Sequence, residues 1–331
     1  MSDALLQVRD LYIGVRDLKV VRGLSLDVAA GELLAVVGES GAGKSVTARA
    51  ILGLLPTGMT VSGSVRLDGR ELVGAPQSTY RQLRGRRIAF VPQDALSVLS
   101  PVHTIGDQLA LAIRSVRRVS RKTARDNAVA ALDRVGIPDA VRRARAYPHE
   151  FSGGMRQRAV IAMATVNDPA LVIADEPTTA LDPTVQAHIL DLLDELRRDS
   201  GTAVMLVTHD LAIAAAHADR ILVMYAGRHV QSGPIEQVLA DPRAPYTAGL
   251  IAALPPREST GRRLPAIVGT PAMPGSLPPG CAFAARCPAA RDICRVEEPA
   301  PFEIGPGHLV SCHRLGELPG RTTELFEEIA G

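Results

Sequence analysis

The sequence predicts an α/β fold: a mostly parallel sheet between helices, with a helical insertion and a loop-rich region at the end. Residues 1–93 and about 161–240 alternate short apolar strand patterns with amphipathic helix patterns, which is typical of parallel sheets covered by helices. Residues 94–160 have few strand patterns, and RKTARDNAVAALDRVG within them shows helical periodicity. More than half of the 24 prolines follow residue 240. We therefore expect a domain over 1–240, with a helical subdomain at about 94–160, and a small loop-rich domain over 241–331.

The composition is typical of a soluble globular protein, with 46% hydrophobic and 22% charged residues in a chain of 331. No apolar run reaches the ~20 residues of a membrane-spanning helix, and MSDALLQVRD lacks the features of an export signal. We therefore expect the chain to stay in the cytosol, where cysteines remain reduced. A basic stretch between Arg114 and Arg145 contains no aromatic residue. This favours a solvated helical face, or a surface near anionic lipid or an acidic partner, over nucleic acid.

A strand, a glycine-rich turn and an amphipathic helix follow one another in ELLAVVGESGAGKSVTARAILGLL, residues 32–55. The turn matches the phosphate-binding pattern G-x-x-x-x-G-K-S/T at every fixed position. Glycines let backbone N–H groups approach phosphate oxygens, and the helix N-terminus adds a favourable dipole. The Lys44 ammonium suits the β- and γ-phosphates, and the Ser45 hydroxyl suits Mg²⁺. The expected phosphate site comprises Gly38, Glu39, Ser40, Gly41, Ala42, Gly43, Lys44 and Ser45.

A second apolar run, PALVIADEPTTALD at residues 169–182, ends in two carboxylates, as a buried parallel strand would. Asp175 is expected to hold Mg²⁺ through water. Glu176 is expected to point the other way along the strand pleat, where it could orient or deprotonate a water molecule. Beside a phosphate loop, this pair favours catalysis over a strand that merely ends in polar residues.

The segment FSGGMRQRAVIAMA, residues 151–164, resembles the signature motif of ABC-type ATPases, commonly written LSGGQ, with Phe151 and Met155 at its variable ends. A serine and two glycines that open a helix form a second anion-binding N-terminus. One ATP does not need two phosphate cradles from one chain, and the resemblance implies a head-to-tail dimer in which each ATP lies between two subunits. The residues expected on the signature side are Ser152, Gly153, Gly154, Met155 and Gln157.

Further elements follow in the order of that family. Gln93, in FVPQDALSVLSPVHTIG, resembles the glutamine that contacts Mg²⁺ and senses the transmembrane partner. Ala180-Leu181-Asp182 resembles the D-loop, and His209 in VMLVTHD resembles the switch histidine. The resemblance implies a P-loop ABC nucleotide-binding domain with a RecA-like core, and ATP and Mg²⁺ as cofactors. It implies Glu176 and His209 as catalytic residues, Asp182 near the nucleotide, and Ser45, Gln93 and Asp175 around Mg²⁺.

One position departs from the family pattern. An aromatic residue ahead of the phosphate loop usually stacks on adenine in this family, and counting back from LSLDV puts that position on or near Val15. Tyr12 lies close by, but we expect it to be a core residue of a strand. Losing a stacking ring forfeits about 1 kcal/mol, so we expect weaker nucleotide selectivity with binding retained.

The region after residue 240 resembles the C-terminal region of ATPases from bacterial dipeptide and oligopeptide importers, on DPRAPYTAGLIAALP and LPPGCAFAARCPAARDIC. The resemblance implies an energy-coupling ATPase at the cytoplasmic face of the cell membrane. Its implied partners are a second similar ATPase, two transmembrane permeases and an extracytoplasmic peptide-binding protein, with no nucleic acid. Because cargo is selected outside this chain, nickel, glutathione or another small solute stays an alternative. A soluble ABC ATPase acting on ribosomes or DNA is disfavoured by the single cassette and the lack of a heptad run.

The four cysteines, Cys281, Cys287, Cys294 and Cys312, lie within 32 residues of this region. Their spacing, C-x5-C-x6-C-x17-C, fits neither zinc fingers nor the ferredoxin run, so alone it only favours a metal over buried thiols or disulfides. The resemblance to peptide-importer ATPases implies a cysteine-bound 4Fe–4S cluster, with zinc as the alternative. Such a site would stabilise a proline-rich domain that has little apolar core.

Overall fold

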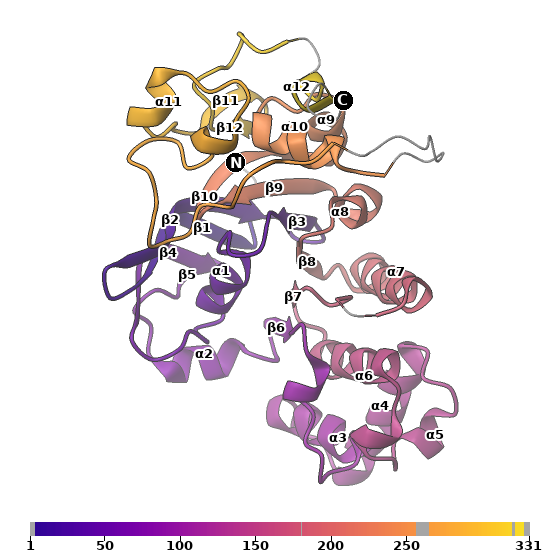
Figure 1. The fold of residues 1–331 in the computed structure, drawn as a ribbon. Helices are drawn as coiled ribbons and strands as arrows, with labels where there is room; N and C mark the ends of the chain where they lie inside the picture. Colours follow the sequence, from indigo (N-terminus) through magenta and orange to yellow (C-terminus); the bar gives the residue numbers. More distant parts are fainter. Residues whose placement is uncertain (1–3, 180, 256–264, 320–321, 328–331) are drawn as a thin grey trace. The chain divides into compact units, whose positions relative to one another are not determined.

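The computed structural model describes residues 4–179, 181–255, 265–319 and 322–327 (Figure 1). The chain forms two compact units. One, called here the helical unit, comprises residues 1–5, 28–32 and 74–206. The other, called the phosphate-loop unit, comprises residues 6–27, 33–73 and 207–331.

The phosphate-loop unit contains two runs of hydrogen-bonded strands. Their orders are β2-β1-β4-β5 and β11-β12-β10-β9-β3. The strands are β1 (Leu6–Val15), β2 (Leu18–Val28), β3 (Leu33–Val37), β4 (Met59–Leu67), β5 (Arg70–Glu71), β9 (Arg220–Tyr225), β10 (Arg228–Pro234), β11 (Phe302–Gly305) and β12 (His308–Val310). Strand β3 runs parallel to β9, and all five of its residues are buried. A strand covered on both faces is apolar throughout rather than at alternate positions, which explains the sequence LLAVV.

The helices of the phosphate-loop unit are short. They are α1 (Lys44–Ile51), α8 (Leu211–His217), α9 (Ile235–Ala240), α10 (Pro245–Ala252), α11 (Asp292–Val296) and α12 (Glu324–Glu327), with the 3₁₀ turn η3 (Ala284–Arg286). The described residues after 240 belong to the same compact unit as the phosphate loop, and β12 extends the sheet by pairing with β10. The separate domain that the sequence suggests after residue 240 therefore stays a prediction.

The helical unit contains β6 (Ile88–Val91), β7 (Leu171–Asp175) and most of β8 (Ala203–Thr208). Strand β6 pairs in parallel with β7, and β7 and β8 are buried throughout. The helices of this unit are α2 (Gln77–Leu83), α3 (Ile105–Val116), α4 (Arg121–Arg134), α5 (Ala140–Arg143), α6 (Gly153–Thr165) and α7 (Pro183–Ser200), with the 3₁₀ turns η1 (Ala95–Ser97) and η2 (Pro148–Glu150).

The strand-poor segment that the sequence predicts at about 94–160 is confirmed among the described residues, since helices fill the chain between β6 and β7 (Figure 1). Helix α4 begins after Ser120, whose hydroxyl accepts a hydrogen bond from the Thr123 amide. This cap satisfies one of the amide groups that a helix start leaves without a partner. The buried residues of α4 are Ala124, Ala128, Ala131 and Leu132, and all four lie in the segment RKTARDNAVAALDRVG, for which the sequence predicts a helix.

In the part of the chain that the structure describes, no helix combines the length and apolar character needed to cross a bilayer.

Candidate functional site

The loop over residues 38–45 joins the end of β3 to the start of α1. Its three glycines serve different purposes. A Cβ on Gly38 would collide with the Met224 carbonyl oxygen, so that glycine permits close backbone packing. Gly43 has φ 95° and caps α1, and a Cβ there would lie 3.2 Å from Val21. Only Gly41, with φ 83° and open space around it, keeps the surface of the loop bare for a ligand.

Lys44, the first residue of α1, is 5% exposed. Its Nζ donates to the carbonyl oxygens of Gly38 at 2.6 Å and Glu39 at 3.1 Å. The ammonium therefore lies inside the loop, close to the amides at the helix start. Of the other loop residues, Ala42 and Gly43 are buried, Glu39 and Ser45 are half-buried, and Ser40 is exposed.

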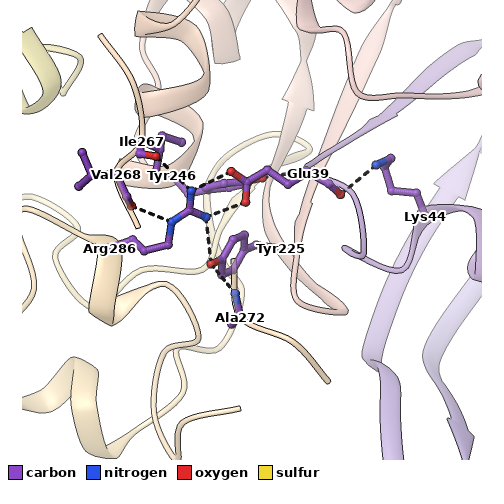
Figure 2. A network of polar contacts seen from close by, with 8 residues as sticks. All are labelled: Glu39, Lys44, Tyr225, Tyr246, Ile267, Val268, Ala272 and Arg286. Atoms are coloured by element: carbon purple, nitrogen blue, oxygen red, sulfur yellow. Dashed lines mark hydrogen bonds and ion pairs between the residues drawn. The ribbon is translucent and has the colours of Figure 1, made fainter. Parts of the chain in front are cut away.

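Glu39 is a predicted loop residue whose side chain contacts a segment far along the chain. Its carboxylate pairs with both terminal nitrogens of Arg286, at 2.6 and 2.9 Å. The Glu39 side chain is therefore directed at the C-terminal segment (Figure 2). An acidic residue inside a phosphate-binding loop repels the phosphate unless a cationic side chain neutralises it. The presence of Glu39 in the loop is therefore the feature of the sequence that could indicate a basic partner for it.

Strand β7 ends at Asp175, which is 3% exposed. Glu176 lies beyond the strand, with φ 48°, and accepts a hydrogen bond from the Thr179 hydroxyl at 2.9 Å. Strand pleating therefore does not explain how the two carboxylates differ. The left-handed backbone at Glu176, which few non-glycine residues adopt, turns its side chain away from the strand direction.

The signature segment forms the start of α6. Ser152 caps the helix and accepts a hydrogen bond from the Met155 amide at 3.3 Å. Gly154 is buried against α7, since a Cβ there would lie 2.5 Å from Val185 Cγ1, whereas a Cβ on Gly153 would lie 3.7 Å from the nearest atom, in Leu181. Ser152 and Gly153 are exposed, so the outer side of this helix start is open to a ligand.

Gln157, which the sequence predicts on the signature side of the nucleotide site, is a buried residue of α6. The residue is 3% exposed, and its Nε2 donates to the Pro92 carbonyl oxygen at 3.3 Å. Pro92 precedes Gln93, an exposed residue just after β6. The structure thus joins the signature helix to the segment of Gln93 through a buried side chain.

The remaining motif residues lie at element ends. Asp182 caps α7, where its Oδ1 accepts from the Val185 amide at 3.0 Å. His209 is exposed and follows β8 directly. Ala180 of the expected D-loop lies outside the described residues. The helical unit carries Gln93, the signature segment, Asp175, Glu176 and Asp182, and the phosphate-loop unit carries residues 38–45 and His209.

Val15 is the last residue of β1 and precedes the phosphate loop in the sequence. The expectation that Tyr12 is a core residue is wrong, because 45% of it is exposed. A register shift in the β1–β4 pairing near Asp10, whose φ is 45°, changes which residues face inward. Leu11 and Ile13 are buried beyond that shift, and Tyr12 between them points outward.

The four cysteines line one cavity of about 60 Å³ in the phosphate-loop unit, together with Tyr246 and Phe283. All four are free thiols. Burial raises the pKa of Cys281 to about 11 and that of Cys287 to about 12. Three of the sulfurs accept backbone N–H hydrogen bonds, from Phe283, Ala289 and Arg314. Among the described residues, however, no three His, Cys, Asp or Glu side chains are arranged closely enough to hold a metal ion.

Two protein families match this chain. Residues 21–179 match the ABC transporter family, and residues 230–294 match the oligopeptide/dipeptide transporter C-terminal region. A probable peptide ABC transporter ATP-binding protein of Sinorhizobium fredii is 48% identical over 96% of this chain and 97% of that protein. The chain belongs to the ATP-binding subunits of ABC peptide transporters.

Other relatives are named as ATP-binding proteins of oligopeptide transport. The oligopeptide transport ATP-binding protein OppD of Escherichia coli is 43% identical over 95% of this chain and 94% of its own length. OppD of Mycobacterium tuberculosis is 48% identical over 96% of this chain, which spans only 53% of that longer protein.

Solved structures confirm the predicted fold class. Part of an ABC transporter complex from Clostridium perfringens, cbiO1, has a TM-score of 0.63 and 27% identity, and the match covers 72% of this chain and 92% of that one. A dimeric ATP-binding cassette in a post-hydrolysis state, bound to ADP and Pi, has the same TM-score and identity, over 70% and 98% of the two chains. The chain therefore has the fold of an ABC ATP-binding cassette, as its motifs predict.

Proposed function

We propose that this ABC ATPase hydrolyses ATP to drive the import of dipeptides or oligopeptides. The observation that carries the proposal is the presence, in one chain, of a phosphate loop with a buried lysine and a C-terminal region that matches oligopeptide/dipeptide transporters. Two relatives that this chain matches over nearly their whole length have names that refer to peptide transport, which supports peptides as the cargo.

Lys44 and the amides at the start of α1 bind the β- and γ-phosphates. The contacts that Lys44 makes with the carbonyls of Gly38 and Glu39 support this role, because they hold the ammonium inside the loop. The bare surface at Gly41 lets backbone N–H groups approach the phosphate oxygens. Ser45, Gln93 and Asp175 would hold Mg²⁺ through their side-chain oxygens, and the ion would supply positive charge to the phosphates.

Glu176 acts as the base that orients and deprotonates the attacking water. The Thr179 hydroxyl holds its carboxylate, which supports a fixed direction for that group. His209, exposed at the end of β8, contacts the γ-phosphate. Removing the base therefore slows hydrolysis without removing any group that binds ATP.

Two subunits close over each ATP, with Ser152, Gly153, Gly154 and Met155 of one facing the phosphate loop of the other. The exposed start of α6 supports this role, since the dipole and the amide groups of a helix N-terminus favour an anion. Asp182, at the start of α7, lies near the nucleotide in this arrangement. Gln157 acts indirectly, by fixing the backbone beside Gln93.

The membrane partners are two permeases at the cytoplasmic face of the cell membrane, and an extracytoplasmic protein delivers the peptide. Three exposed apolar side chains follow Gln93, namely Leu96, Val98 and Val102, with 54%, 45% and 73% of each exposed. Apolar side chains gathered on a surface favour a protein partner. This supports contact between the segment after Gln93 and a permease.

Cys281, Cys287, Cys294 and Cys312 would hold a 4Fe–4S cluster with a structural role, or zinc as the alternative, if their sulfurs came closer together than they lie in this structure. Their shared cavity supports a metal–thiolate site, and the N–H groups that reach three sulfurs offset part of the burial that raises the pKa of these thiols. Iron, zinc and acid-labile sulfide in protein purified anaerobically test this proposal. A folded protein that contains neither metal would overturn it.

The Glu176→Gln variant tests the catalytic assignment in the assembled transporter. We expect it to bind ATP as the wild type does and to release phosphate at least 100-fold more slowly, since general-base catalysis contributes about 10²–10⁴-fold. Glu195→Gln makes the same chemical change on an exposed position of α7 and should leave the rate unchanged. Hydrolysis by Glu176→Gln at the wild-type rate would show that the base is another residue.

The cargo is tested in the native host. Deletion of the gene should abolish uptake of labelled di- and oligopeptides, and the wild-type chain should restore it while Lys44→Ala does not. Uptake of peptides that is unaffected by the deletion, with loss of nickel or glutathione uptake instead, would contradict the peptide assignment.

A further inference from the structure

Among the described residues, Glu39 of the phosphate loop contacts the C-terminal segment, which here means the chain after residue 240, through both its side chain and its backbone. Its side chain forms a bidentate ion pair with Arg286, at 2.6 and 2.9 Å. Its backbone N–H donates to the Tyr246 hydroxyl at 3.0 Å. Its carbonyl oxygen accepts from Lys44 Nζ at 3.1 Å, so the contacts lead directly to the phosphate-binding lysine (Figure 2).

Arg286 is itself fixed on several sides. Its Nε donates to the Val268 carbonyl at 3.0 Å, and its Nη2 donates to the Ile267 carbonyl at 3.3 Å. Its Nη1 donates to the Tyr225 hydroxyl at 3.2 Å, and the guanidinium lies 5.9 Å from the Tyr225 ring centre. Only 5% of the side chain is exposed. A planar guanidinium held in this way presents its remaining N–H groups to Glu39 in one orientation.

Tyr246 is equally well fixed, since it is 1% exposed and packs against Tyr225 and Phe283. Burial and the neighbouring Glu39 carboxylate raise the pKa of Tyr246, so the hydroxyl stays neutral and available to the Glu39 amide. Both the side chain and the backbone of Glu39 are therefore held by rigid partners.

We propose that Arg286 and Tyr246 are positioning residues for ATP, because they hold the phosphate loop in its binding conformation through Glu39. The inference rests on the proposed nucleotide site. Arg286 also neutralises a carboxylate that would otherwise repel the triphosphate from inside the loop. A loop ordered before ATP arrives loses less conformational freedom on binding, so the contact raises affinity rather than the rate of hydrolysis.

The C-terminal segment does not depend on this pair for its attachment. Glu298 forms separate ion pairs with Arg22 at 2.8 Å and Arg228 at 3.0 Å. Strand β12 also pairs with β10. Loss of Arg286 therefore leaves the segment in place, and its effect on ATP can be measured in folded protein.

The experiment measures ATP affinity by fluorescence of a labelled ATP, together with KM and kcat for hydrolysis in the assembled transporter. We expect Arg286→Met to weaken binding and raise KM about tenfold, with kcat changed less than twofold, since coupled charge pairs typically shift affinity by that order. The double variant Glu39→Gln/Arg286→Met also removes the uncompensated carboxylate, so it should recover only the part of the affinity lost to charge repulsion, because the contact that holds the loop is still absent. Arg286→Lys, which keeps the charge, should show an intermediate loss.

Arg291→Met is the matched control, because it removes an exposed ion pair with Glu317, 2.8 Å long, in the same segment. It should bind ATP as the wild type does. Unchanged ATP affinity in Arg286→Met, or a double variant that binds ATP as tightly as the wild type, would overturn the inference that this contact positions the loop. Lys44→Ala must lose binding in the same assay. If Lys44→Ala binds normally, the nucleotide site itself is misplaced.

Discussion

Replacing Gly154 by alanine should separate α6 from α7 at the signature segment. An ideal Cβ on Gly154 would lie 2.5 Å from Cγ1, 3.1 Å from Cγ2 and 3.4 Å from Cβ of Val185. Carbon atoms pack best about 3.5–4.0 Å apart, so the two helices must move apart by about 1 Å or Val185 must leave its rotamer.

The cost of the Gly154→Ala change follows from two opposing effects. Overpacking costs about 1–3 kcal/mol, and alanine recovers about 0.5–1 kcal/mol in a helix because it loses less backbone entropy than glycine. The net expectation is a loss of about 1–2 kcal/mol, which corresponds to local opening that is about 5–30 times more frequent.

Hydrogen–deuterium exchange of peptides from α6 and α7 measures this loss locally, which suits a chain of two compact units better than a global unfolding curve. Gly153→Ala is the control, because its Cβ would meet only Leu181, at 3.7 Å. In the Val185→Ala background, which removes both colliding methyl groups, Gly154→Ala should add no further exchange. Gly154→Ala that exchanges like Gly153→Ala would refute the packing argument.

Three other changes have defined outcomes. Val15→Tyr should tighten ATP binding by up to about fivefold by adding a ring at the adenine position, with Val15→Leu as the control, and the idea fails if affinities for ATP and GTP do not change. Gln157→Leu should remove the side chain that donates to the Pro92 carbonyl at 3.3 Å and lower the local stability by about 1–3 kcal/mol. Hydrogen–deuterium exchange near Pro92 should become faster, whereas Gln82→Leu, at an exposed position, should leave it unchanged. Burial lowers the pKa of His229 from 6.5 to about 4, so only the unfolded chain takes up the proton between these values. The free energy of unfolding, measured with urea, should therefore fall by roughly 3 kcal/mol from pH 6.5 to 4. The His229→Gln variant should lose less stability over this pH range, and an equal loss in the two proteins would contradict the reasoning.

The sequence by itself determined the fold class and the local form of each motif. The strand, turn and helix around residues 38–45 are as expected, because an uninterrupted apolar run, glycines and a helical pattern each act over a few neighbouring residues. The start of α6 at Ser152 and the end of β7 at Asp175 follow for the same reason. The cap of a helix and the burial of a strand on both faces each produce a recognisable residue pattern within a single element.

Tertiary structure alone decided what these residues contact. The sequence predicts that Glu39 belongs to the phosphate loop, and only the fold shows that its carboxylate pairs with Arg286, 247 positions later in the chain. Gly154 must be glycine because Val185 of another helix lies against it, and Gln157 is buried because it reaches the Pro92 carbonyl. Glu176 leaves the strand through a left-handed residue that pleat alternation could not predict. Contacts between distant segments depend on how whole elements pack, and no periodicity within a single element records that packing.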